Sequence, residues 1–288
     1  MPELPEIETI KLQLQKVLIG QTIVDIKQLH KKSLHGDREL VNDKKITGIK
    51  RFGKMLILDL EGKLDIAIHF KMSGQLILTK GKQEQRIVGG HPTEDWVGKL
   101  PSNHTRVTFR FKSGDTMYFN DQRLFGWVKI MTQDELKNLP FLKNLGPEIW
   151  NISAAEFFKL LQKKKKPVKV AIMDQEMISG VGNIYANDAL WEAKIHPQTR
   201  TQSLTIGKAK LLQNALVKVL KEGIKYGGAT AADAKYIDLH GLGGTYQEHF
   251  RVYDRERLLC LRCKAKIKKI TLGGRGTYFC PNCQSEAH

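Results

Sequence analysis

Apolar residues near the start of the chain recur with the period of an α-helix. The positions that set this period are Ile7, Ile10, Leu14 and Val17. They predict a helix over residues 4–18, with Gly20 as its stop signal. Because proline lacks a backbone N–H donor, Pro5 fits only the first turn of this helix.

An alternating pattern of apolar and polar residues follows, from residue 23 to residue 130. Its clearest runs are residues 54–60, 64–70, 106–111 and 116–120, with turns at Gly62, Gly74 and Gly114. Several short strands at this spacing predict a two-layer antiparallel β-sandwich. Residues 81–103 combine glycine, proline and charge without a period, so we expect a long loop there.

The rest of the chain predicts a linker, a helical domain and a small terminal module. Ser153 and Glu156 have the spacing of a helix capping box. Residues 229–249 are rich in glycine and mixed in polarity, which favours a mobile loop. The expected boundaries are a β-sandwich domain over 1–135, a linker over 136–150, a helical domain over 151–250 and a terminal module over 251–288.

Positive charge dominates the chain. Its 288 residues include 47 Lys and Arg against 30 Asp and Glu, a net charge of +17. Such an excess attracts polyanions and favours counterion release, so nucleic acid is the first expected partner and an anionic membrane surface the second. No apolar run approaches the roughly 18 residues of a membrane-spanning helix, and the acidic, proline-rich start is not typical of a signal peptide. We therefore expect a soluble, intracellular protein.

All four cysteines lie in the terminal module, as two C-x2-C pairs separated by residues 264–279. They are Cys260, Cys263, Cys280 and Cys283. Four thiolates at this spacing can close a tetrahedral zinc shell, whereas two disulfides would require an oxidising compartment. The pattern favours one structural zinc ion. Since the segment is too short to build a core of its own, metal binding would supply its folding free energy.

Several motifs now point to one family. They are PELPE at residues 2–6, HFKMSG at 69–74, DQRLFG at 121–126, LGPE at 145–148, GVGNIY at 180–185, and the four-cysteine module with Arg275. In this order, along nearly the whole chain, they resemble bacterial formamidopyrimidine-DNA glycosylases, the base-excision repair enzymes for oxidised purines. The resemblance implies an α+β multidomain fold, in which the helical domain carries a helix–two-turn–helix element and the module is a β-hairpin zinc finger.

The resemblance implies catalytic roles for four residues. With Met1 removed, Pro2 would be a terminal secondary amine that attacks C1′ of the nucleotide and forms a Schiff base. Glu3 would move protons as the sugar opens, with support from Glu6. Lys54 would contact phosphate and assist β-elimination, and Arg275 would flank the lesion and promote δ-elimination. In an unrelated protein Pro2 would simply start a helix, and Lys54 would be an ordinary solvated lysine.

The resemblance also implies a set of DNA contacts. A glycosylase must extrude the damaged nucleotide from the duplex. Met72, Arg123 and Phe125 match the three side chains that fill the vacated space, with Arg123 facing the opposite cytosine. The remaining implied DNA contacts are His104, Lys165, Lys169 and Asn183. Residues 229–249 match a lesion-capping loop.

We therefore expect a monomeric, bifunctional DNA glycosylase and AP lyase that acts on damaged double-stranded DNA and has no membrane partner. An endonuclease VIII-like enzyme for oxidised pyrimidines is the nearest alternative, although Leu4 and the three void-filling residues favour the purine enzyme. A catalytically silent zinc-containing DNA-binding protein is the other. The joint presence of Pro2, Glu3, Lys54 and Arg275 argues against it.

Overall fold

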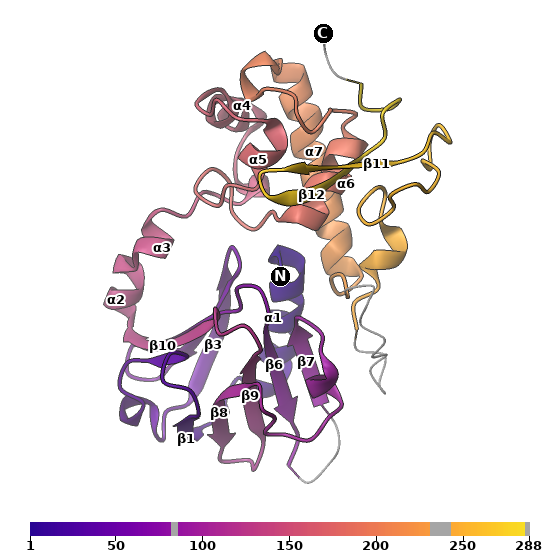
Figure 1. Cartoon of the computed structure of the whole chain (residues 1–288). Coiled ribbons are helices and arrows are strands. Elements are labelled where there is room, and N and C mark those ends of the chain that lie inside the picture. The colour runs from indigo at the N-terminus through magenta and orange to yellow at the C-terminus, as the bar shows by residue number, and fades with distance from the viewer. Residues whose placement is uncertain (82–85, 231–242, 286–288) are drawn as a thin grey trace. The chain divides into compact units, whose positions relative to one another are not determined.

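The computed structural model describes residues 1–81, 86–230 and 243–285 (Figure 1). The chain forms two compact units, and neither is continuous in sequence. The first contains Met1–Lys143 and Tyr226–Gln247, and the second contains Asn144–Lys225 and Glu248–His288. Within the described residues, no helix has the length and apolar character needed to cross a membrane.

The first unit is a β-sandwich with one long helix. One sheet has the order β1 (Ile23–Gln28), β8 (Thr105–Phe111), β9 (Thr116–Asp121), β6 (Gly74–Thr79) and β7 (Arg86–Gly90). The other has the order β2 (Leu34–His35), β10 (Trp127–Thr132), β5 (Leu64–His69), β4 (Met55–Leu60) and β3 (Ile46–Phe52). All neighbouring strands are antiparallel except the short β10–β2 pair.

Helix α1 (Leu4–Leu18) coincides with the predicted helix and adds its apolar stripe to the sandwich core. Ile7, Ile10 and Leu14 are buried there. The helix packs against β7 of one sheet and β3 of the other. Consequently helix α1 is held on the sandwich by strands of both sheets.

One expectation about a loop in this unit was wrong. The expected loop at 81–103 contains strand β7 and the short helix η2 (Glu94–Trp96). Another short helix, η1 (Glu39–Val41), follows β2. The stretch after the sandwich also forms α2 (Gln133–Asn138) and α3 (Pro140–Lys143). Leu136 of α2 packs on Met55, Ile57 and Ala67, so these helices cover the outer face of the β4–β5 pair.

The second unit combines helices with a terminal β-hairpin. Its helices are η3 (Ile149–Asn151), α4 (Ala154–Gln162), α5 (Val168–Ile172), α6 (Asn183–Glu192), η4 (Thr201–Ser203) and α7 (Ile206–Lys225). The capping box of Ser153 and Glu156 opens α4 as predicted. Helix η5 (Tyr246–His249) precedes the hairpin of β11 (Lys268–Leu272) and β12 (Arg275–Phe279), and β12 packs against α6. The predicted α+β architecture is confirmed.

Candidate active site and zinc centre

The N-terminus of α1 holds two buried glutamates next to Pro2. Glu3 is the N-cap residue and is 2% exposed. The Glu6 carboxylate accepts a hydrogen bond from the Glu3 backbone N–H, at 2.7 Å from nitrogen to Oε2. Pro2 is also buried. The backbone that follows Pro2 is therefore fixed by a side chain from the first turn of the same helix.

The second oxygen of Glu6 binds a distant part of the same unit. Its Oε1 accepts the backbone N–H of Ala229 at 2.8 Å. Gly228 has a φ of 85°, and a Cβ there would lie 2.8 Å from Cγ of Glu6, so only glycine permits this approach. Glu6 thus joins the N-terminal site to the start of the predicted capping loop. Residues 231–242 of that loop lie outside the described part of the chain.

Lys54 lies in the two-residue turn between β3 and β4. Phe52 and Met55 close this turn, and Gly53 has a φ of 54°. The side chain of Lys54 is buried, with 6% exposure for the residue. A lysine in a hairpin turn would ordinarily stand in solvent, so burial here separates Lys54 from an ordinary surface cation.

An ion pair fastens this turn to helix α1. Arg51 Nε donates to Glu8 Oε2 at 2.7 Å, and Arg51 Nη1 donates to the carbonyl oxygen of Gly53 at 2.9 Å. Burial raises the pKa of Glu8, but hydrogen bonds from Lys11 and Arg51 outweigh it and lower the pKa overall. Sequence reasoning missed both residues of the pair, because nothing local connects position 8 with position 51.

His69 is a neutral neighbour of this site. It lies opposite Met55 in the β4–β5 ladder and contacts the rings of Trp127 and Phe141. Burial, followed by the charges of Lys71 and Lys54, lowers the pKa of His69 to about 3. It therefore adds no positive charge beside Lys54 at neutral pH.

The structure brings the loops of the three predicted void-filling residues together. Met72 precedes Ser73, and Ser73 Oγ donates to Asp121 Oδ1 at 2.5 Å. The backbone N–H of Arg123 donates to the same Ser73 Oγ at 3.0 Å. The guanidinium carbon of Arg123 lies 5.1 Å from the centre of the Phe125 ring, which is 54% exposed.

Asp121 organises the loop that carries Arg123 and Phe125. It is fully buried, and its second oxygen accepts the backbone N–H of Gly126 at 2.6 Å. Leu124, between the two probes, has a φ of 58°, an unusual value for a residue with a side chain. The backbone N–H of Asp121 donates to the carbonyl oxygen of His104 at 2.9 Å. Sequence reasoning gave Asp121 no role of its own.

His104, a predicted DNA contact, is paired within the protein. Its Nδ1 lies 3.0 Å from Asp95 Oδ2, and its side chain is 35% exposed. The ring can therefore still reach a ligand while Asp95 fixes its orientation.

The second unit contains Asn183, Lys169 and Arg275 around the β11–β12 turn. Gly273 and Gly274 both have positive φ, which makes a tight two-residue hairpin turn and leaves Arg275 exposed at the start of β12. Lys169 is fully buried, and its ammonium group donates to Gly276 O at 2.9 Å and Thr277 Oγ1 at 2.7 Å.

Asn183 supports the same strand. It is the first residue of α6, after Gly182, and its Nδ2 donates to the carbonyl oxygen of Gly276 at 3.1 Å. Lys169 and Asn183 therefore hold the backbone next to Arg275. As direct DNA contacts, both stay predictions.

Lys165 differs from its neighbours in the lysine run. Lys164 and Lys166 lie 2.9 Å and 3.9 Å from Asp174 Oδ2. Lys165 is exposed, and within the described chain its ammonium group has no ion-pair partner. This leaves its charge available for an external anion.

The four cysteines form a compact cluster that fits zinc. Their sulfur atoms all lie within 4.8 Å of one another, with Cys263 and Cys280 at 3.4 Å and Cys260 and Cys283 at 3.9 Å. A tetrahedral zinc ion with Zn–S bonds of about 2.3 Å requires sulfur atoms about 3.8 Å apart. The donor set therefore fits one structural zinc ion, as predicted.

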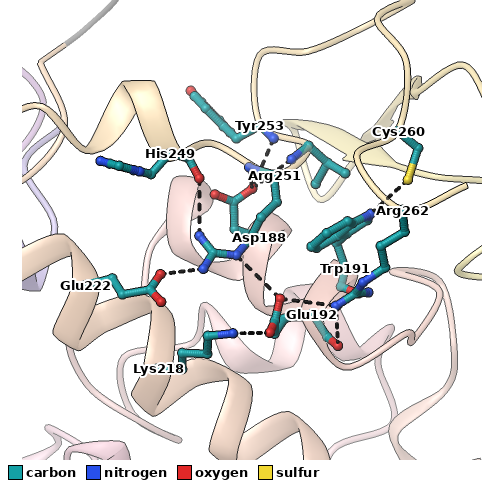
Figure 2. A network of polar contacts seen from close by, with 11 residues as sticks. Asp188, Trp191, Glu192, Lys218, Glu222, His249, Arg251, Tyr253, Cys260 and Arg262 are labelled. Atoms are coloured by element: carbon teal, nitrogen blue, oxygen red, sulfur yellow. Dashed lines mark hydrogen bonds and ion pairs between the residues drawn. The ribbon is translucent and has the colours of Figure 1, made fainter. Parts of the chain in front are cut away.

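Helix α6 holds the chain that leads into this finger (Figure 2). Asp188, fully buried, accepts the backbone N–H groups of Arg251, Val252 and Tyr253 through Oδ1, at 3.0–3.2 Å. Burial raises the pKa of Asp188, and these hydrogen bonds oppose that effect. Three consecutive backbone donors on one carboxylate oxygen fix the direction in which the finger leaves the helical unit.

The arrangement defines a class of protein that joins a β-sandwich with an N-terminal proline site to a helical unit with a zinc finger. Three protein-family models match segments of this chain. Residues 1–128 match the formamidopyrimidine-DNA glycosylase N-terminal domain, residues 145–235 its H2TH domain, and residues 258–285 a zinc finger found in FPG and IleRS.

Whole-chain comparisons agree with these matches. Formamidopyrimidine-DNA glycosylases of Pelotomaculum thermopropionicum and Thermus thermophilus are 36% and 34% identical, with 99% of both chains covered in each case. A structure of Lactococcus lactis Fpg with DNA containing an abasic site superimposes with a TM-score of 0.85 at 30% identity, covering 99% of this chain and 100% of the other. The chain belongs to the formamidopyrimidine-DNA glycosylase family. It is a DNA glycosylase, in a family whose members also have AP lyase activity.

Proposed function

We propose that this protein removes oxidised purines, 8-oxoguanine and formamidopyrimidines, from duplex DNA through a Schiff base on Pro2, and then cuts the strand by β,δ-elimination. The observation that carries the proposal is the N-terminal site. Pro2 and Glu3 lie at the start of α1, Glu6 fixes the backbone between them, and the Glu8–Arg51 pair fastens the Lys54 turn to the same helix. Whole-chain similarity to formamidopyrimidine-DNA glycosylases adds support.

Base excision would start with Met1 removed and Pro2 neutral. The Pro2 nitrogen attacks C1′ of the nucleotide and the bond from C1′ to the base breaks; the proton that the Pro2 nitrogen then loses balances the proton that the departing base takes up. Glu3 donates a proton to the ring oxygen as the sugar opens, which produces the iminium ion.

Strand cleavage would follow from the same intermediate. Loss of a C2′ proton expels the 3′ phosphate, and a second elimination expels the 5′ phosphate. Lys54 assists the first elimination, and Arg275 assists the second with its planar fork on phosphate. Water then hydrolyses the Schiff base, which frees Pro2 and releases the sugar remnant as an unsaturated aldehyde. The other products are a free base and a one-nucleotide gap with a phosphate at each end.

Met72, Arg123 and Phe125 would fill the duplex after the nucleotide leaves the stack. Their loops share the Ser73–Asp121 hydrogen bonds, so they are suited to act as one unit. Lys165, Asn183, His104 and Lys169 would bind or support binding of the backbone. We further propose that the protein acts as a monomer, in the cytoplasm on nucleoid DNA, because its bacterial relatives are glycosylases of DNA.

Oxidised pyrimidines are a second candidate substrate class. One Lactococcus lactis structure with a TM-score of 0.85 and 30% identity is of Fpg in complex with DNA containing an oxidised pyrimidine. Excision of oxidised pyrimidines, the activity of the endonuclease VIII-like alternative, is therefore tested beside the purine assignment. The two differ in the lesion that is excised fastest.

The deciding experiment is a single-turnover nicking assay. Duplexes carry 8-oxoguanine opposite each of the four bases, and a parallel duplex carries thymine glycol. We expect the 8-oxoguanine:cytosine duplex to be cut fastest, with both ends phosphorylated. Glu3→Gln should lose base excision while it retains DNA affinity, because the amide keeps the size of the side chain but cannot donate the proton. Faster cutting at thymine glycol would favour the pyrimidine enzyme, and binding without cutting would favour the silent zinc protein.

A further inference from the structure

Trp191 donates a hydrogen bond to one of the four zinc-binding cysteines. It lies one residue before the end of α6 and is 5% exposed. Its indole nitrogen is 3.3 Å from Sγ of Cys260, and both side chains belong to the apolar cluster at the base of the finger (Figure 2). A buried indole N–H ordinarily finds an acceptor, and here that acceptor is a thiolate of the metal site.

Arg262 covers one face of the indole ring. The guanidinium carbon lies 3.6 Å from the centre of the Trp191 ring. Arg262 Nη1 also donates to the carbonyl oxygen of Trp191 at 2.6 Å. Arg262 lies between Cys260 and Cys263 in the sequence. The loop that presents these two ligands is therefore fixed to Trp191 by both a sulfur contact and a cation–π contact.

Glu192 in turn fixes Arg262. Its Oε2 accepts Arg262 Nη2 at 3.1 Å and lies 3.5 Å from Arg251 Nε, and its other oxygen pairs with Lys218 of α7. One carboxylate thus holds cations from the finger loop, the finger base and the longest helix of the unit. This network leaves the indole little freedom to turn its N–H away from Cys260.

The charge of a four-thiolate zinc site explains what the hydrogen bond from Trp191 would do. Zinc with four thiolates carries a net charge of −2, so each sulfur is electron-rich. A hydrogen bond to sulfur withdraws electron density, orients the ligand and makes it a weaker nucleophile. Cys263 is exposed, whereas Cys260 is fully buried.

We infer that Trp191 is a positioning residue of the zinc centre: its indole N–H binds the Cys260 thiolate, restrains that ligand, and couples retention of the metal to helix α6. Asn183, at the other end of α6, contacts the strand of Arg275. The inference concerns the metal site and does not depend on the Pro2 mechanism.

The test variant is Trp191→Phe, which keeps an aromatic ring under Arg262 and removes only the donor. Trp127→Phe, the same change in the other unit, is the control. Both full-length proteins are loaded with cobalt to record the thiolate-to-metal charge-transfer bands, and with zinc to follow release to a chromogenic chelator. We expect shifted bands and release about tenfold faster or more for Trp191→Phe alone, the scale found when outer partners of metal ligands are lost. Bands and rates equal to wild type would overturn the inference.

A measurement on the wild-type protein tests the same inference even where the Trp191→Phe variant does not fold. The protein is loaded with cadmium-113 and labelled with nitrogen-15 at its four tryptophans. We expect one indole N–H proton to show scalar coupling to the metal through the hydrogen bond to sulfur. The absence of any coupled indole signal in the loaded protein would overturn the inference on its own.

Discussion

Arg51 and Glu8 form an ion pair of 2.7 Å that fixes the Lys54 turn on helix α1. The N-cap residue of this helix is Glu3, another proposed catalytic residue. Their side chains are 7% and 14% exposed. Arg51 also binds the carbonyl oxygen of Gly53, directly before Lys54. Neither Arg51 nor Glu8 is proposed to touch DNA. The pair is therefore expected to position Lys54 without taking part in the reaction.

Replacing Arg51 by Met should destabilise the protein and slow strand cleavage. Glu8 would lose one of its two cationic partners in a largely buried place and keep Lys11, at a cost of about 1–3 kcal/mol in free energy of unfolding. Urea denaturation measures this, and single-turnover cleavage of an abasic-site duplex measures the effect on Lys54. Arg110→Met is the control, because its pair with Asp25 is 53% and 29% exposed and is expected to contribute about 0–1 kcal/mol. Equal losses in the two variants would contradict the positioning role.

Arg123 should set the preference for the base opposite the lesion. Its fork can donate to the two acceptor atoms of an orphaned cytosine, whereas adenine presents a donor on the same edge. A good bidentate contact contributes roughly 1–3 kcal/mol of discrimination, so cutting of 8-oxoguanine should be about tenfold or more faster opposite cytosine than opposite adenine. Arg123→Ala should lose most of this ratio. An unchanged ratio would assign the reading of the opposite base to another residue.

Asp121→Asn should reproduce part of the Arg123→Ala phenotype without removing the guanidinium group. Each oxygen of the buried Asp121 carboxylate accepts hydrogen bonds from the probe loop or from Ser73. An amide has one acceptor oxygen, so one set of contacts must break. We expect a lower cytosine-to-adenine ratio in the same cutting assay. A variant with the wild-type ratio would show that the loop keeps its shape without this carboxylate.

Asp65 should make stability depend on pH between about 4 and 6. It neighbours Asp59 across the β4–β5 pair, and both are buried. Burial, followed by the charge of Asp59, raises the pKa of Asp65 from 3.8 to about 6. The folded state then binds a proton that the unfolded state releases, so this contribution is present below pH 4 and is lost as pH rises through 6.

Asp65→Asn should therefore be more stable than wild type at pH 7, by about 1–3 kcal/mol, and equal to it near pH 4. Urea denaturation of both proteins from pH 4 to pH 7 measures the difference. A difference that is constant over this range would contradict the raised pKa.

Local patterns predicted the elements whose stabilising contacts are periodic in sequence. The apolar spacing of Ile7, Ile10 and Leu14 predicted helix α1, and the strand pattern located β4, β5, β8 and β9 of the sandwich. Strand β7 was not predicted because its glycines, Gly89 and Gly90, are typical of loops. In the fold these glycines are required for close packing: a Cβ at Gly89 would meet Ile10 at 2.2 Å, and one at Gly90 would meet the Gly74 carbonyl oxygen at 2.5 Å.

The residues of the site also fall into two groups, those that a local sequence pattern predicts and those that it does not. The cysteine spacing predicted the metal cluster because a C-x2-C turn is a local feature. Contacts between distant residues left no local signal, as with Glu8 and Arg51 or Trp191 and Cys260. Lys169 shows most clearly that neighbouring residues in the sequence do not predict burial. Its sequence environment is basic, whereas its ammonium group is fully buried against Gly276 and Thr277.

The central claim is that the Pro2 nitrogen forms the covalent intermediate, and borohydride trapping tests it most directly. The enzyme is mixed with an 8-oxoguanine:cytosine duplex and sodium borohydride, digested, and the cross-linked peptide is located by mass spectrometry. The account predicts a reduced adduct on Pro2 of chains that lack Met1, and no adduct on chains that retain it. An adduct on Lys54 or another lysine, or strand cleavage with no adduct, would contradict it.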